Sequence, residues 1–297
     1  MSRKGKAPDR RSVPGAGAPA ASPPAGGTAR RVALAVLLVA GLGVSAWLAD
    51  RSFRADEVPR SPTADTIDDA TLRSLLASAD EAIRTGDPGA ALPTLFGLQR
   101  SAPGNVQIAT ALGRALRGVG RVPESDDVLM EAFRQHPSDP ALRVEASLTR
   151  EMLGDDAGAL DLITAAVDAY PSLGEPLETR GMIHYRRGRW AEAQRDFDAA
   201  FRVDPARPWV LVHAGMARLE MEDPAGAEAY FARCVAADPG IGDAYAGLAI
   251  IAAQRGDVAS AESRLAHSRH VEPGDTLLQT AAQTEIDAAR AKAPPPR

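Results

Sequence analysis

The sequence predicts an all-α protein: a solenoid of about six helix pairs, closed by a capping helix and preceded by one transmembrane helix. Three observations support this fold class. Aromatic residues make up only 4 % of the chain, and no alternating strand pattern is present. An 18-residue run without charge lies near the N-terminus. Prolines recur every 34 residues, at Pro103, Pro137, Pro171, Pro205, Pro239 and Pro273. A fixed period of this length indicates a repeat array, whose units bury their apolar faces on one another.

The prolines set the register of the repeat. With each proline at position 32 of its unit, the six units begin at Leu72, Val106, Pro140, Gly174, Pro208 and Gly242. Position 15 of the unit is glycine except for Glu222 in the fifth unit. Glycine predicts the end of a first helix there, because the chain needs a left-handed conformation. Pro88, Pro123 and Pro224 follow this turn, in the first turn of a second helix. The period-defining proline then ends the second helix.

The two helices of each unit are expected to pack closely. Positions 8 and 20 hold Gly, Ala or Ser in every unit, while position 24 is always large and apolar. Small residues let the helices approach, and the large residue fills the space between them. Pro93 lies inside the second helix of the first unit, which predicts a kink or a shortened helix. Apolar residues from Leu277 to Ala289 recur at helical spacing and predict the capping helix.

This pattern resembles the tetratricopeptide repeat. The fourth unit matches the family at Gly181, Ala193, Phe197, Ala200 and Pro205. The sixth matches at Tyr245, Leu248, Gly256, Ala261 and Pro273. The resemblance covers Leu72 to about Asp275. It implies a right-handed superhelix whose first helices line a concave groove at unit positions 2, 5, 9, 12 and 13, and a role in binding proteins rather than in catalysis.

Carried over position by position, the resemblance implies a largely apolar groove. Its residues are Val144, Leu148, Met152, Met182, Tyr185, Arg186, Trp209, Val212, Met216, Leu219, Ala246 and Ile250. Exposed apolar patches mark interaction sites, and an extended peptide or a partner helix with apolar anchors would suit this one. Trp209 is the expected anchor, because tryptophan is enriched at binding hot spots. The alternative interpretation is that these side chains pack against a neighbouring helix or the capping helix.

Residues 32–49 form the predicted transmembrane anchor. At 1.5 Å per residue they span about 27 Å, close to the hydrocarbon thickness of a bilayer. Residues 1–31 hold seven basic side chains and one acid, which places the N-terminus in the cytoplasm and the repeats outside it. Basic residues also follow the C-terminal end of the 32–49 segment and favour the opposite orientation. They are Arg51, Arg54 and Arg60. Cleavage near Ala46 by a signal peptidase, giving a secreted protein, is the alternative.

The predicted organisation follows from these segments. It comprises a disordered basic tail (1–31), the anchor (32–49), a linker with the start of the first helix (50–71), six units (72–275), a capping helix (276–291) and a tail (292–297). Gly41, Ser45 and Ala49 form a small-residue row that could pair anchors in a homo-oligomer. The expected location is the inner membrane, with a single pass.

The sequence offers no catalytic constellation. Phosphate-binding glycine loops, HExxH and nucleophile elbows are all absent. His267 and His270 could share a helix face but lack a third metal ligand, so neither a metal nor a cofactor is expected. The chain carries −5 overall and +6 over residues 1–49, so the remainder carries −11. An acidic repeat region argues against nucleic-acid binding. Cys234 is expected in the core.

The leading functional hypothesis is a membrane-anchored adaptor that binds peptide or helix segments of other envelope proteins. The chain is similar in organisation to bacterial single-pass repeat proteins of secretion, envelope assembly or cytochrome maturation. A second hypothesis is a non-catalytic subunit that holds an enzyme or its substrate chain in such a process. One stable stoichiometric enzyme partner would favour the second hypothesis, and many sub-stoichiometric partners would favour the first.

Overall fold

The structure is a computed structural model that describes residues 67–292. These residues form helices joined by short turns, with no strand among them, so the all-α prediction is confirmed. The first helices of six successive pairs are α2 (Asp69–Arg84), α4 (Val106–Gly118), α6 (Pro140–Met152), α8 (Gly174–Arg186), α10 (Val210–Glu220) and α12 (Gly242–Gln254). The second helices are α3 (Pro88–Ser101), α5 (Val122–Gln135), α7 (Asp156–Ala169), α9 (Trp190–Val203), α11 (Pro224–Ala237) and α13 (Val258–Val271). A single helix, α14 (Leu277–Lys292), ends the array.

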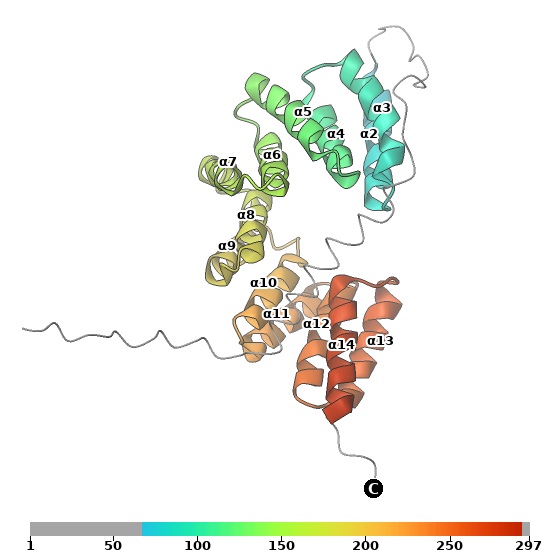
Figure 1. The fold of residues 1–297 in the computed structure, drawn as a ribbon, viewed down its shortest axis with the longest axis vertical. Helices are drawn as coiled ribbons and strands as arrows, with labels where there is room; N and C mark the ends of the chain where they lie inside the picture. Colours follow the sequence, from blue (N-terminus) through green and yellow to red (C-terminus); the bar gives the residue numbers. More distant parts are fainter. Residues whose placement is uncertain (1–66, 293–297) are drawn as a thin grey trace, which may run out of the picture.

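The pairs follow one another along an arc from α2 and α3 to α12, α13 and α14 (Figure 1). Each first helix packs against the first helix of the next pair, and α12 packs against α14. Within residues 67–292, successive second helices make no close backbone contact. The array therefore curves toward its first helices. They line the inner face of the arc, and the second helices spread over the outer face.

Each turn inside a pair has the same left-handed geometry. Gly86, Gly120, Gly154, Gly188 and Gly256 have φ between 69° and 87°. The N–H after each glycine bonds a carbonyl five residues back, as from Asp155 to Arg150 at 2.9 Å, which caps the end of the first helix. Glu222 adopts the same conformation, with φ 57° and the matching bond from Asp223 to Arg218. The fifth unit thus keeps the turn without the glycine.

The period-defining prolines end the second helices. Each helix stops two residues before its proline, and the intervening residue lies outside the helical conformation, as His136 does at φ −130° and ψ 63°. This is the restriction that a proline imposes on its predecessor. Pro88, Pro123 and Pro224 occupy first-turn positions, as predicted. The helix that contains Pro93 spans 14 residues, like the other second helices, so the expected shortening is absent.

The core of each pair forms where position 8 meets position 24. Phe197 and Phe231 are fully buried, and so is Leu129. A Cβ added to Gly181 would lie 2.7 Å from the Phe197 ring, and one added to Gly215 would lie 2.6 Å from the Phe231 ring. The position-20 side chains are buried in all six units. The small residues thus make the close approach that the sequence predicts.

The helix α14 covers the inner side of the last pair. Leu278, Ala281, Ala282 and Ile286 are buried in one cluster with residues of α12 and α13. The opposite face of α14 carries exposed residues such as Thr280, Thr284 and Asp287. A polar outer face is what a capping helix needs at the end of a repeat array.

Several predicted segments lie outside the described residues. The basic tail (1–31), the anchor (32–49) and most of the linker fall there, as do residues 293–297. Between residues 67 and 292, none of the helices combines the length and the apolar character that a membrane crossing requires. The anchor therefore stays a prediction.

Candidate binding surface

The structure divides the twelve predicted groove residues into two groups. Four are buried, with Val144 at 3 % exposure, Val212 at 4 %, and Ala246 and Ile250 at 0 %. These four offer no surface to a partner, which corrects the expectation for them. The other eight keep exposed area on the inner side of units three to five. They are Leu148, Met152, Met182, Tyr185, Arg186, Trp209, Met216 and Leu219.

The burial of the first group has a common cause. Val144, Val212 and Ala246 all stand at unit position 5, and every other residue at that position is buried as well. Because first helices pack directly on one another, position 5 lies in the contact between them. Ile250 stands at position 9 but faces α14, with which it shares a cluster. For these residues, packing against a neighbouring or capping helix is the correct interpretation.

Position 9 forms an apolar row along the inner face. Leu148 of α6, Met182 of α8 and Met216 of α10 are half-buried and occur one repeat apart. Tyr185 and Leu219 lie one turn further along the same helices and are also half-buried. We call these five residues the inner row. Half-buried apolar side chains held by a packed scaffold form a preorganised surface for an apolar partner.

Trp209 lies just before α10, at its N-cap, and is 42 % exposed. The guanidinium carbon of Arg207 lies 5.2 Å from the centre of the Trp209 ring. Arg207 also pairs with Glu178 of α8, with 2.7 Å between Nη2 and Oε2. His213 Nδ1 lies 3.3 Å from the other carboxylate oxygen. The indole is thus fixed through Arg207 while a large part of it faces solvent. Nothing in the repeat pattern marked Arg207, which lies in the turn before α10.

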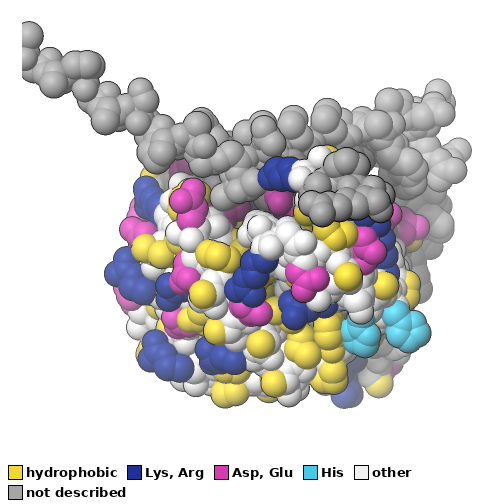
Figure 2. Space-filling model, turned by 90° about the horizontal axis from the view of Figure 1, so that it is seen from below, with side chains coloured by type: hydrophobic (Ala, Val, Ile, Leu, Met, Phe, Trp, Pro, Cys, Tyr) yellow, Lys and Arg dark blue, Asp and Glu magenta, His cyan; other side chains and the backbone are white. Residues whose placement is uncertain are grey.

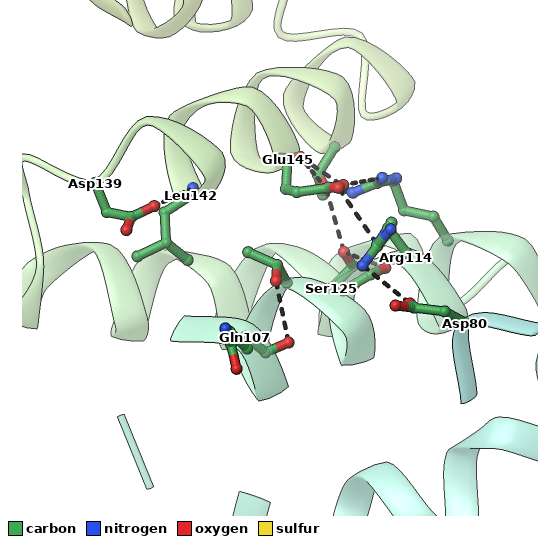
Figure 3. Close-up of polar contacts among 11 residues, drawn as sticks. Asp80, Gln107, Arg114, Ser125, Asp139, Leu142 and Glu145 are labelled. Atoms are coloured by element: carbon green, nitrogen blue, oxygen red, sulfur yellow. Dashed lines mark hydrogen bonds and ion pairs between the residues drawn. The ribbon is translucent and has the colours of Figure 1, made fainter. Parts of the chain in front are cut away.

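Charged side chains tie the first helices of the N-terminal units together. Figure 3 shows Arg114 of α4 between Asp80 of α2 and Glu145 of α6. The nitrogen–oxygen distances are 3.0 Å to Asp80 and 3.5 Å to Glu145. Arg117 binds the same Glu145 carboxylate and donates to the Thr149 hydroxyl at 3.0 Å. Glu145 is only 8 % exposed, so removing both arginines would leave a buried charge uncompensated.

Two more inter-unit contacts border the inner row. Arg186 of α8 donates to Glu151 of α6 at 2.7 Å. The Tyr185 hydroxyl donates to Glu220 of α10 at 3.2 Å. Burial raises the pKa of the Glu220 carboxyl, and the bond from Tyr185 offsets this only in part. Burial, and then the neighbouring carboxylate, raise the pKa of Tyr185 as well. No ion pair reaches Glu220 from any described residue, so it accepts a proton more readily than an exposed glutamate.

The described residues show no centre for other chemistry. In residues 67–292, no group of three His, Cys, Asp or Glu side chains is placed to hold a metal ion. His267 packs edge-to-face against Tyr245, with ring centres 4.3 Å apart. Burial raises the pKa of the Cys234 thiol to about 12, so it stays protonated and unreactive near neutral pH. Figure 2 shows positive, negative and hydrophobic side chains interspersed on the face of the molecule that it draws.

Comparisons with known proteins agree with this geometry. Two models of the tetratricopeptide repeat match the sequence, at residues 110–173 and 218–286. The chain is a tetratricopeptide repeat protein. No curated protein matches it. Tetratricopeptide repeats indicate a protein–protein interaction scaffold with protein partners, and proteins of this family are generally non-catalytic.

Solved structures share the fold at low sequence identity. A tetratricopeptide repeat protein from Parabacteroides merdae is 19 % identical with a TM-score of 0.54, over 74 % of this chain and 87 % of its own. A thermophilic tetratricopeptide repeat protein of Thermus thermophilus is 18 % identical with a TM-score of 0.51, over 62 % and 98 %. PilF of Pseudomonas aeruginosa is 14 % identical with a TM-score of 0.53, over 72 % and 96 %. At these identities the likeness shows the fold alone.

Proposed function

We propose that this tetratricopeptide repeat protein is an adaptor that holds an apolar peptide or helix of another protein on the inner face of units three to five. The observation that carries the proposal is the inner row of Leu148, Met182, Tyr185, Met216 and Leu219, which is half-buried, together with the exposed Trp209 at the start of α10. Methionine side chains adapt to partners of different shape. Arg186 and Glu151 already neutralise one another, so the favourable contact with a partner is mainly apolar.

The proposal places the adaptor at a membrane. The support is the uncharged run at 32–49 and the seven basic residues before it. In this arrangement the N-terminus is cytoplasmic, and the repeats recruit envelope proteins outside the cytoplasm. Retention of 32–49 can be checked by the intact mass of the protein purified from its own membrane fraction. A mass that lacks residues 1–46 would instead identify a secreted protein.

The decisive experiment is affinity purification of the full-length protein, solubilised in detergent, followed by quantitative mass spectrometry. The test variant is Trp209→Ala/Met216→Ala. The matched control is Trp190→Ala/Met221→Ala, which removes one tryptophan and one methionine away from the inner row. Loss of a hot-spot tryptophan costs about 2 kcal/mol or more, which weakens binding about 30-fold. Partners of the inner face should therefore be depleted in the test variant and kept in the control.

Circular dichroism separates binding from folding in this experiment. The test variant should keep its helix content, because both side chains retain exposed area. An unchanged partner set in a folded test variant would overturn the proposal. Unfolding of the test variant alone would place Trp209 or Met216 in the core and overturn it as well.

A further inference from the structure

A pocket lies on the outer side of the array, away from the inner row. It is a pocket of about 380 Å³ between α5, α6 and α7, three helices that follow one another along the arc (Figure 1). We call it the outer pocket. Its lining residues are Met130, Phe133, Arg143, Arg150, Gly158, Asp161, Leu162 and Ala165. A volume of this size is at the lower end of ligand-binding pockets.

The repeat itself explains why this space is open. Two units further along the chain, α9 and α11 replace α5 and α7. Phe201 takes the place of Phe133, while Tyr230 and Arg233 take the places of Leu162 and Ala165. At these two positions, the seam between α9 and α11 has a large aromatic and a long cationic side chain. The outer pocket has only leucine and alanine at the equivalent positions. The pocket is the volume that these two side chains would fill.

The filled seam shows what chemistry fits. The Tyr230 hydroxyl donates to Asp198 at 2.7 Å. The Arg233 guanidinium carbon lies 5.4 Å from the centre of the Phe201 ring and 5.3 Å from that of Tyr230. One guanidinium therefore lies over both the tyrosine ring and the phenylalanine of the preceding unit. The outer pocket keeps that phenylalanine as Phe133.

Three charged residues line the outer pocket, namely Arg143, Arg150 and the acid Asp161. Arg150 is neutralised by Asp126 at 2.7 Å and Asp155 at 3.2 Å. Arg143 stacks on Phe133 and donates to the Pro137 carbonyl at 2.8 Å. Asp161 is exposed, and no described residue forms an ion pair or hydrogen bond with it. It lies one helical turn before Ala165, so it would adjoin a guanidinium placed where the Ala165 side chain ends.

We propose that the outer pocket is a second protein-binding site, which takes one tyrosine-like aromatic side chain and a neighbouring arginine or lysine from a partner chain. The aromatic ring packs on Met130, Phe133 and Leu162, in the volume that Tyr230 fills two units later. The cation lies beside Asp161. This site does not depend on the inner row, and it adds a second contact with separate specificity on the outer face.

The test uses methyl signals of methionine in the full-length protein, placed in lipid nanodiscs and labelled at the methionine methyl groups. Met130 reports on the outer pocket, and Met182 and Met216 report on the inner face. The probe is the blocked dipeptide Ac-Tyr-Arg-NH2, and its matched control is Ac-Ala-Arg-NH2. The tyrosine peptide should shift the Met130 signal in a saturable way, with affinity at least about tenfold above that of the control peptide.

Two variants separate the parts of the site. Leu162→Tyr/Ala165→Arg copies the fifth unit into the third and should abolish the Met130 response. Its matched control, Ala157→Tyr/Ala169→Arg, adds the same groups at exposed positions of α7, with the arginine two turns away from Asp161, and should leave the response intact. Asp161→Asn changes only an exposed charge, so it keeps the fold. It should weaken Ac-Tyr-Arg-NH2 about two- to fivefold and leave Ac-Tyr-Ala-NH2 unchanged.

Three results would overturn the proposal. The first is an equal Met130 response to the tyrosine and alanine peptides. The second is a response in a folded Leu162→Tyr/Ala165→Arg protein that matches the parent. The third is a shift at Met182 and Met216 with none at Met130, which would assign the peptide to the inner face. Because the methionines report separately, failure of this site and failure of the inner row are distinguishable.

Discussion

Glu222 is the residue at which the chain departs most clearly from its own repeat. It takes a left-handed turn conformation, with φ 57°, that glycine supplies in the other five units. A side chain with a Cβ is strained in this region by about 1–2 kcal/mol. The hydrogen bonds of the turn are complete all the same, from Glu222 to Leu219 at 3.0 Å and from Asp223 to Arg218 at 2.9 Å. The surrounding helices therefore impose the conformation.

Replacing Glu222 with glycine should stabilise the protein. The relief of strain exceeds the extra entropy that glycine gives to the unfolded chain, which costs about 0.4–1 kcal/mol. We expect a net gain of about 0.5–1 kcal/mol and a rise in melting temperature of about 1–4 °C, measured by circular dichroism. Gly154→Ala places a Cβ at φ 78° and should shift the midpoint the other way. A melting temperature of Glu222→Gly below that of the parent would contradict the inference that Glu222 is strained.

Glu220 should make stability depend on pH. Its pKa is raised in the folded state above the ordinary 4.5, so the folded protein binds the proton more tightly than the unfolded chain. The stabilisation by this proton is complete below the unfolded pKa and is lost as pH rises through the folded pKa. Glu220→Gln keeps the contact with Tyr185 without the charge. It should be more stable than the parent near pH 7 and equal to it near pH 4, in urea unfolding at both values. If the difference in unfolding free energy between Glu220→Gln and the parent were the same at both pH values, Glu220 would not be a destabilised buried carboxylate.

In each helix pair, the residue at unit position 8 and the residue at position 24 are matched in size. Where position 8 is glycine, position 24 is phenylalanine or leucine. Where position 8 is alanine or serine, as at Ala79 and Ser147, position 24 is leucine or isoleucine. The contact distances explain this pairing, because a Cβ at Gly181 would lie 2.7 Å from the Phe197 ring. The two positions should therefore behave as one packing element.

Gly181→Ala should destabilise the protein by about 1–3 kcal/mol, the usual cost of overpacking a filled core. The double variant Gly181→Ala/Phe197→Leu restores the pairing found in other units. It should be more stable than the sum of the two single changes predicts, by about 1 kcal/mol in a double-mutant cycle. Gly89→Ala is the control, because its new Cβ meets atoms only at 3.6 Å or more and the helix gains propensity. Additive effects would show that the ring and the glycine do not share the space.

At the scale of the whole molecule, the sequence predicted what lies within a unit better than what lies between units. The prolines, the turn glycines and the position-24 residues depend on local geometry that recurs in every unit. The burial of Val144 and Ala246 depends instead on how closely first helices approach one another, and that of Ile250 depends on α14. The outer pocket was missed for the same reason. Leu162 is an ordinary helix residue until it is compared with Tyr230 and with the helix that faces it.

Helix α14 covers the apolar side of the last helix pair and so protects the end of the array from solvent. Ile286 of α14 is 1 % exposed and packs in the cluster that includes Ala246 and Ile250, while Ala288 lies on the exposed face of the same helix. Ile286→Asp would place a charge without a partner in this cluster, which costs several kcal/mol, so α14 should detach. We expect strong binding of the dye ANS and self-association in analytical ultracentrifugation, because the apolar side of α12 becomes exposed. Ala288→Asp adds the same charge on the outer face and should behave like the parent. If Ile286→Asp neither bound the dye nor self-associated more than the parent protein, the inner side of α12 would not need its cover. The sixth unit would then be stable without α14.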